Sequence, residues 1–310
     1  MLRPGFAATL CFALATAGCA DAASTPQALA KAAQAAFDRG DFDAARALAD
    51  LDGAPAELQF FYFDNVRECA GESRCTVATA PVDAEFREQW AEQARREHAD
   101  APPIEGLLSV TMKGKDGSSS GTMQMPYAKL GASYRLVTLH LSPAEIARRR
   151  ATSAEQAMHE MLAAGIYDNA SRARRTDWET AATKLPADGG PAGAALLHQT
   201  TAMAAAVDAH DPDAAMRSGG HMAALIYADK DYAGTPLPLD ARKRKLQVQA
   251  LRMLRDVKIS GGYQLAENAV LMIEARDGIG WIERGAVLLS LEGDQWDIAG
   301  KQLVTFPPGK

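Results

Sequence analysis

Four cysteines are the residues whose spacing points most clearly to chemistry. Cys11 and Cys19 lie in an apolar N-terminal segment, and five residues separate Cys69 from Cys75. An even pair at such short spacing is typical of a disulfide in an exported protein. A metal site would need two more ligands nearby, whereas the intervening residues offer only Glu72. We therefore predict a disulfide between Cys69 and Cys75.

The first nineteen residues are typical of an export signal. Arg3 precedes an apolar stretch over residues 6–17, which is short for a bilayer span, and Thr16-Ala17-Gly18-Cys19 follows it. This tetrapeptide resembles a bacterial lipobox, whose Cys carries lipid, although Thr16 stands where Leu or Val is usual. The alternative is an ordinary secretory signal cleaved after Ala20 or Ala22. We expect a protein of the bacterial cell envelope, on the periplasmic side, lipidated at Cys19 and anchored in the outer membrane.

Histidines, hydroxyls and carboxylates form no recognisable catalytic or metal-binding motif. The one cluster of ligand-type residues is His210-Asp211-Pro212-Asp213 with His221, and its aspartates also suit turn and capping roles. The one Gly-x-Ser-x-Gly match, residues 117–121, lies in a glycine-rich stretch that is expected to be a hairpin loop, without the following helix that a nucleophile turn requires. If the protein is an enzyme, Asp208 and His210 are the acid–base candidates. The sequence itself predicts no catalytic residue, no cofactor and no metal.

Composition limits the partners that the chain can have. The sequence has 310 residues, enough for two ordinary domains, with 47% hydrophobic and 23% charged residues. The net charge is −6 and no basic stripe is present. Nucleic acid is therefore not an expected partner. The expected membrane contact is the lipid anchor.

The C-terminal stretch from Asp256 to Phe306 predicts a meander of antiparallel strands. Residues 295–306 alternate apolar and polar side chains, and residues 279–291 and 263–276 precede them as two further runs. Glu283 and Gly285 interrupt the apolar face of the middle run. Helices over residues 191–216 and 240–254 are expected to cover the sheet. This order predicts an α+β fold with helices packed on a curved antiparallel sheet.

Three segments of this region resemble the nuclear transport factor-like superfamily, which includes ketosteroid isomerase and scytalone dehydratase. They are residues 206–215, residues 224–227 and Gly293-Asp294-Gln295-Trp296-Asp297-Ile298. The resemblance covers about residues 191–306 and implies a cone-shaped domain. None of the matching residues corresponds to the catalytic groups of the isomerase.

A weak internal repeat suggests that the cone-like domain occurs twice. Residues 35–46 match residues 205–216 at seven of twelve positions. Residues 83–98 are expected to correspond to residues 240–254. We predict a signal in residues 1–19, an α+β domain in 24–165, a linker in 166–190 and a cone-like domain in 191–310. The alternative is an unrelated N-terminal domain that shares only an Ala-rich helix.

The function expected from these features is non-enzymatic binding of a small apolar ligand or of an envelope protein. One alternative is an isomerase, dehydratase or hydrolase that uses the C-terminal cone. Another is an adaptor for envelope assembly. A cone filled with Leu, Met and Trp would favour binding, whereas a buried carboxylate with a shifted pKa would favour the enzyme.

Overall fold

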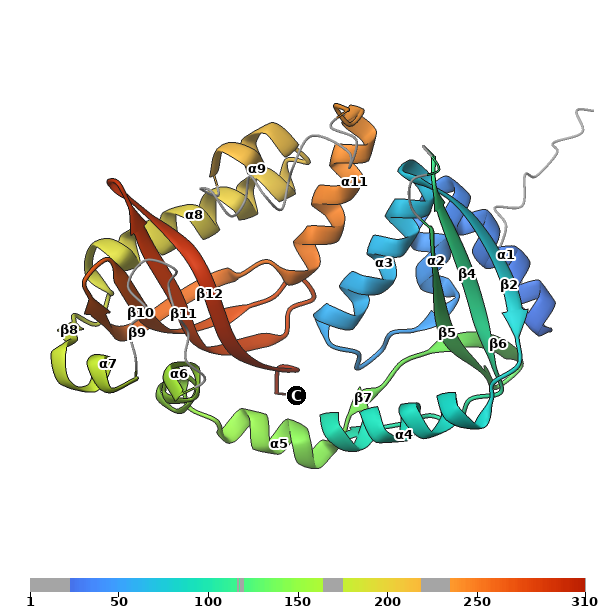
Figure 1. The fold of residues 1–310 in the computed structure, drawn as a ribbon, viewed down its shortest axis with the longest axis horizontal. Helices are drawn as coiled ribbons and strands as arrows, with labels where there is room; N and C mark the ends of the chain where they lie inside the picture. Colours follow the sequence, from blue (N-terminus) through green and yellow to red (C-terminus); the bar gives the residue numbers. More distant parts are fainter. Residues whose placement is uncertain (1–22, 116, 118–119, 164–174, 219–234, 310) are drawn as a thin grey trace, which may run out of the picture.

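The computed structural model describes residues 23–115, 117, 120–163, 175–218 and 235–309. Its fold is α+β, with two units side by side, each made of helices packed on a sheet (Figure 1). The first unit comprises residues 23–141. The second unit comprises the elements that follow.

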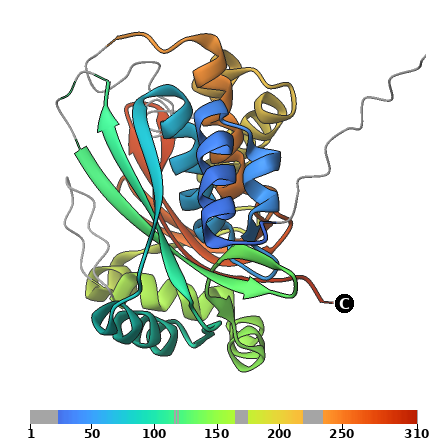
Figure 2. The ribbon, with the colours of Figure 1, turned by 90° about the vertical axis from the view of Figure 1, so that its right-hand side faces the viewer.

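The first unit packs its N-terminal helices on one face of a five-stranded sheet (Figure 2), while Phe86 and Trp90 of a later helix pack with Ala128 and Val137 on the other face. Its helices are α1 (Pro26–Arg39), α2 (Phe42–Ala47), α3 (Ala56–Gly71) and α4 (Ala84–Glu97). Its sheet has the order β1-β6-β5-β4-β2, built from β1 (Ala49–Asp50), β2 (Ser73–Ala80), β4 (Gly106–Gly114), β5 (Ser120–Leu130) and β6 (Ser133–Val137). Pairing is antiparallel except between β1 and β6. A separate short ribbon pairs β3 (Ala99–Asp100) with β7 (His140–Leu141).

The second unit has an antiparallel sheet in the order β12-β11-β10-β9-β8. Its strands are β8 (Thr183–Leu185), β9 (Arg255–Leu265), β10 (Asn268–Arg276), β11 (Ile282–Glu292) and β12 (Gln295–Phe306). Its described helices are α5 (Pro143–Ala151), α6 (Ala154–Ala163), α7 (Arg175–Ala181), α8 (Gly190–Asp208), α9 (Pro212–Ser218), α11 (Leu239–Gln249) and the 3₁₀ turn η1 (Ala250–Arg252).

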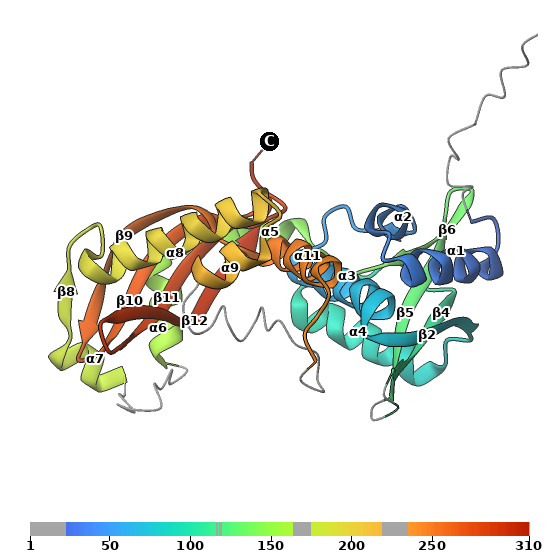
Figure 3. The ribbon, with the colours of Figure 1, turned by 90° about the horizontal axis from the view of Figure 1, so that it is seen from above.

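Helices cover both faces of this second sheet (Figure 3). On the face toward α8, the core holds Leu196, Leu271, Ile273, Leu289 and Trp296. On the opposite face, α6 and α7 contribute a second cluster of Met158, Met161, Leu162 and Trp178, packed on Val270, Ala286 and Leu288. The space between the second sheet and α8, which corresponds to the interior of the expected cone, is therefore filled with apolar side chains.

The packing places the division between the units differently from the sequence-based boundaries. Helix α6 lies within the expected N-terminal domain of residues 24–165, yet it packs on the second sheet. The expected linker, 166–190, contains α7 and β8, and β8 is a strand of that sheet. Helix α6 thus belongs to the second unit by its packing. Both faces of the second sheet are apolar, so helices must bury each of them.

The internal repeat is visible in the hydrogen bonds that end α1 and α8. Asp41 donates its backbone N–H to Ala36 O at 3.0 Å, and Asp211 donates to Ala206 O at 2.9 Å. Each aspartate then caps the following helix, accepting from the N–H of the residue three positions later at 3.0 Å. The turn residue before each aspartate, Gly40 or His210, is left-handed. The repeated residues therefore adopt the same turn and cap in both units.

Two details of the expected element pattern are wrong. The helix at residues 83–98 follows the first long strand of its sheet, whereas α11 precedes its own, so α11 corresponds in order to α3 and not to α4. Residues 263–276 do not form one strand, because a turn at Ala266-Glu267 divides them between β9 and β10. Ala266 has a φ of 51°, and nothing in its type signals a turn.

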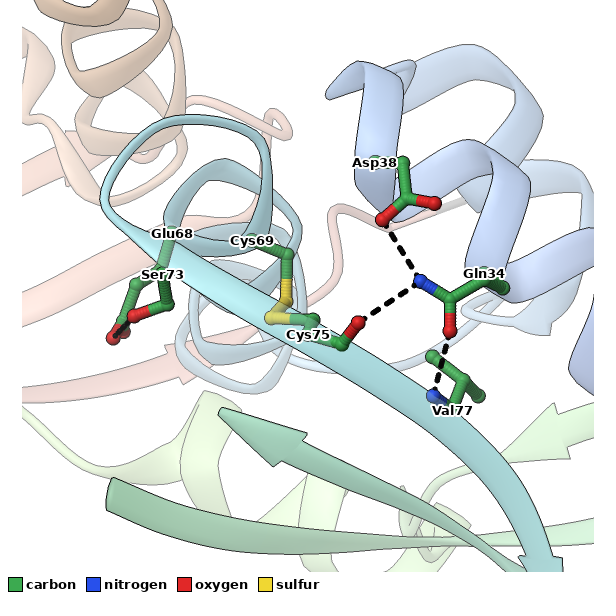
Figure 4. Close-up of a disulfide and its surroundings, with 7 residues drawn as sticks. All are labelled: Gln34, Asp38, Glu68, Cys69, Ser73, Cys75 and Val77. Carbon is green, nitrogen blue, oxygen red and sulfur yellow. Dashed lines mark hydrogen bonds between the residues drawn. A yellow bond between two sulfur atoms is a disulfide. The ribbon is translucent and has the colours of Figure 1, made fainter. Parts of the chain in front are cut away.

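The predicted disulfide between Cys69 and Cys75 is present and joins the end of α3 to the edge strand β2 (Figure 4). Beside it, Gln34 of α1 donates to the Cys75 carbonyl at 3.1 Å and accepts from the Val77 N–H at 2.7 Å. A side-chain amide thus takes the place of a neighbouring strand and closes this part of the β2 edge.

Helix α3 of the first unit and helix α11 of the second lie against each other between the units (Figures 1 and 3). Val248 of α11 is fully buried and belongs to the apolar core of the first unit, together with Phe60 and Phe63 of α3. Burial and the nearby Arg67 guanidinium lower the pKa of Lys245 in the same contact.

We predict that Val248 couples the unfolding of the two units. Val248→Ala should lower the free energy of unfolding by about 2 kcal/mol, because it removes two buried methyl groups and leaves a cavity. Val248→Asp should divide a single urea transition into two, because an unpaired charge would not stay in that core. Leu239→Asp, at an exposed site in the same helix, is the control. A single, unshifted transition for Val248→Asp would contradict the coupling.

Candidate functional site: the interdomain cleft

A cleft of about 430 Å³ lies between the two units, below the contact of α3 with α11. We call it the interdomain cleft. Both units contribute to its walls, so it exists only when they are packed together. It contains charged and apolar side chains in similar proportion, unlike the filled interior of the cone.

The first unit supplies the N-terminal end of α3 and the ribbon of β3 and β7. Residues 55–58 form one part of this wall, and Ala99, Leu139 and Leu141 form another. Gln93 and Glu97 of α4 complete it. Pro55 precedes α3 in extended conformation, which is how the chain enters the helix at the cleft.

The second unit supplies the end of its sheet. Lys301, Gln302, Leu303 and Thr305 come from β12, and Glu283 comes from the neighbouring strand β11. Glu283 lies opposite Thr305 in the register of the two strands. Polar groups therefore gather where the apolar face of the sheet ends.

Glu283 is the most distinctive group of the cleft. Its side chain is only 8% exposed, and its Oε2 has no hydrogen-bond partner. Lys301 Nζ lies 4.0 Å from that oxygen, beyond hydrogen-bond distance. Burial raises the pKa of the Glu283 carboxyl, and the Lys301 charge opposes the shift. Among the described residues, none donates a hydrogen bond to this buried oxygen.

Asp277, in the loop before β11, is a second buried carboxyl close to Glu283. Its Oδ1 accepts from the Ile279 and Trp281 N–H groups at 3.0 and 2.8 Å, while its Oδ2 is unpartnered. Burial raises the pKa of Asp277 to about 6, against these hydrogen bonds. The negative charge of Asp277 also raises the pKa of Glu283, because two nearby carboxylates repel each other.

The cleft's two arginines are already engaged. Arg252 pairs with Glu57 at 3.0 Å and lies 3.4 Å from the centre of the Phe60 ring. Arg149 pairs with Glu145 at 2.7 Å and donates to the Thr305 carbonyl at 3.2 Å. Hydrogen bonds from Arg148 and Arg149 lower the pKa of Glu145 to about 2. Of the cleft's basic groups, Lys301 is therefore the least constrained.

This arrangement suits recognition by hydrogen bonds or proton transfer at Glu283. Within the described ranges, no three His, Cys, Asp or Glu side chains are grouped as metal ligands would be. A buried carboxyl with a raised pKa accepts a hydrogen bond when ionised and donates one when protonated. The chemistry available to the cleft is thus that of a carboxyl group beside a lysine.

The acid–base candidates from the sequence lie elsewhere. Asp208 is exposed and pairs with Arg255 at 2.8 Å, and a hydrogen bond from Arg255 lowers its pKa. His210 forms the left-handed turn after α8, and Asp211 caps α9. His221 and Cys19 lie outside the described residues.

Glu283 and Asp277 are the site residues that sequence reasoning missed. The available signal was Glu283 itself, which interrupts the apolar alternation of its strand. A polar residue on a buried strand face indicates either a bulge or a site. The structure shows that Glu283 stays in register opposite Thr305, so no bulge explains it.

Comparison with known proteins finds no relative: no family model, no curated protein and no solved structure matches this chain. None of the helices in the described ranges has both the length and the apolar character of a membrane span.

We predict that Asp277→Asn stabilises the protein increasingly as pH rises. The folded pKa of about 6 exceeds the ordinary 3.8, so the stability linked to this proton is complete below about pH 4 and lost as pH passes 6. Relative to Asp294→Asn, an exposed control, the unfolding free energy of Asp277→Asn should gain about 2 kcal/mol between pH 4 and pH 7. Urea titrations at each pH measure it, and a difference that does not change with pH would contradict the assignment.

Proposed function

We propose that this protein is a lipid-anchored protein of the bacterial envelope that binds a ligand or partner in the interdomain cleft without catalysing a reaction. One observation carries the proposal. The open, partly polar space lies between the units, beside a buried carboxylate oxygen that accepts no hydrogen bond from the described residues, whereas the interior of the cone is filled.

The filled cone is the reason for placing the ligand between the units. Leu196, Leu271, Ile273 and Leu289 are essentially inaccessible on the face that an enzyme of this shape would use. A ligand there would have to displace close-packed side chains, and a well-packed core resists such insertion. The cleft requires no such rearrangement.

Membership of the nuclear transport factor-like superfamily is part of the proposal. Its support is the order of elements in each unit, with a helix pair and a third helix before a meander, and the sequence resemblance over residues 191–306. Envelope location is likewise proposed, from the signal-like residues 1–19 and from a disulfide of the kind found in oxidising compartments.

A second candidate function is acid–base catalysis on a small molecule, as an isomerase, dehydratase or hydrolase. It is favoured by Glu283 and Asp277, two neighbouring carboxyl groups whose pKa values burial raises. Glu283, which lines the cleft, would act as the base. Turnover that is lost in Glu283→Gln would favour this candidate over binding alone.

We predict that protein isolated from its own host's membranes carries a non-covalent occupant that depends on Glu283. Native mass spectrometry should show an added mass that denaturation removes. Glu283→Gln should lose most of it, because a neutral amide forms no ion pair with a cationic donor. Glu292→Gln, at an exposed site on the same strand, should keep it. Equal retention by both variants would contradict binding in the cleft.

We also predict that Cys19 attaches the protein to the membrane. Cys19→Ala should move the protein from the membrane fraction to the soluble periplasmic fraction and remove the lipid mass. Cys11→Ala should leave both unchanged, because residue 11 lies in the part of the signal that is removed. A Cys19→Ala protein that stays in the membrane fraction would contradict lipid anchoring.

A further inference from the structure

The cleft borders the open edge of a sheet. Strand β12 is the last strand in the order β12-β11-β10-β9-β8, and four of its residues line the cleft. An edge strand presents backbone N–H and C=O groups that can pair with another chain. Only every second residue of an edge strand directs these groups outward.

The register of β11 with β12 identifies the outward-directed residues of β12. Leu291 donates its N–H to Glu267 O at 2.7 Å on the β10 side, so odd-numbered residues of β11 direct their backbone groups to β10 and even-numbered ones to β12. Because Leu288 pairs with Gly300, the alternation leaves Lys301, Leu303 and Thr305 directed away from β11. These three outward residues all line the cleft.

Side chains close the two ends of this edge but not its middle. Gln199 of α8 donates to the Trp296 carbonyl, and Arg149 of α5 donates to the Thr305 carbonyl. Within the part of the chain that the structure describes, the outward backbone groups of Lys301 and Leu303 have no such partner. Elsewhere the protein closes an edge, as Gln34 does along β2.

The side chains around this open edge favour a basic partner. Glu283 and the residues at 301, 303 and 305 share one face of the sheet, because Glu283 is in register with Thr305. Glu283 Oε2, to which no described residue donates a hydrogen bond, lies on that face, whereas the other acidic residues of the cleft, Glu57 and Glu97, pair with Arg252 and Arg96. A strand placed beside β12 would put every second side chain on the same face as this oxygen, and a long side chain opposite Thr305 could reach across toward it.

We propose that the occupant of the interdomain cleft is an extended peptide segment of a partner protein, added to β12 as a further strand, with a Lys or Arg side chain that donates to Glu283. The inference rests on the proposed binding function and names its partner. The distance from Lys301 to Thr305 is about 13 Å at 3.3 Å per residue, so the segment in contact is about five residues long.

The test uses the mature chain and a defined probe, the pentapeptide acetyl-Thr-Val-Lys-Val-Thr-amide. Amide hydrogen exchange measured by NMR at saturating peptide should slow at Lys301 and Leu303, the two open positions. A peptide with N-methylated backbone amides should not slow it, because it lacks the donors for the strand. A peptide with Glu in place of Lys should bind about tenfold more weakly, since it places a second carboxylate beside Glu283.

Protein variants separate the backbone contribution from that of the side chains. Lys301→Pro removes an outward N–H at an edge position where proline is tolerated, and should weaken binding of the Lys peptide about fivefold to tenfold. Lys301→Ala keeps the N–H and removes a competing cation near Glu283, so it should strengthen binding. Circular dichroism establishes that each variant is folded, and the N-methylated peptide tests the same contact without altering the protein.

Two results would overturn the inference in different ways. If the peptide shifts cleft resonances such as Leu58 but exchange at Lys301 and Leu303 is unchanged, strand addition is wrong while binding in the cleft stands. If neither the Lys nor the Glu peptide binds, a basic strand partner is wrong. An occupant found by native mass spectrometry and lost in Glu283→Gln would then still support the proposed function.

Discussion

Val248 lies in the core of a unit to which its own helix does not belong, and the candidate site depends on that contact. The packing of α11 on α3 joins two tandem units into one body. It also brings Glu57 beside Arg252, and it sets the open edge of β12 opposite the β3–β7 ribbon. In this arrangement, the loss of the helix contact would remove the cleft without disturbing either sheet.

Two buried carboxyl groups at the end of the second sheet destabilise the fold. Asp277 and Glu283 each keep one buried carboxylate oxygen without a hydrogen bond, although burial disfavours their ionised forms. Groups of this kind destabilise a fold unless something else satisfies them. Arg149 and Arg252 are fully engaged nearby, so the chain had cations available and does not direct them to Glu283. The proposed donor from outside the chain would satisfy the open oxygen of Glu283, which lines the cleft.

Local patterns allowed much of the fold to be predicted, and contacts between the units account for most of the rest. Alternation predicted β12, and residue spacing predicted the Cys69–Cys75 disulfide. The repeat at Asp41 and Asp211 predicted related units, and the structure gives both aspartates the same turn and cap. The turn at Ala266 was missed because its residue type does not favour a positive φ. The cleft was missed because it joins α3 to β12, and no local pattern encodes a meeting of elements so far apart in the chain. Glu283 was noticed only as an interruption of its strand.

The central claim is that the space between the units, and not the interior of the cone, is the binding site. The most direct test is a structure of the protein purified from its own host's envelope without denaturation. The account predicts additional density in the cleft, beside Glu283 and along Lys301 to Thr305, with the apolar core around Leu271 and Leu289 unchanged. An empty cleft with density inside a widened cone would contradict it.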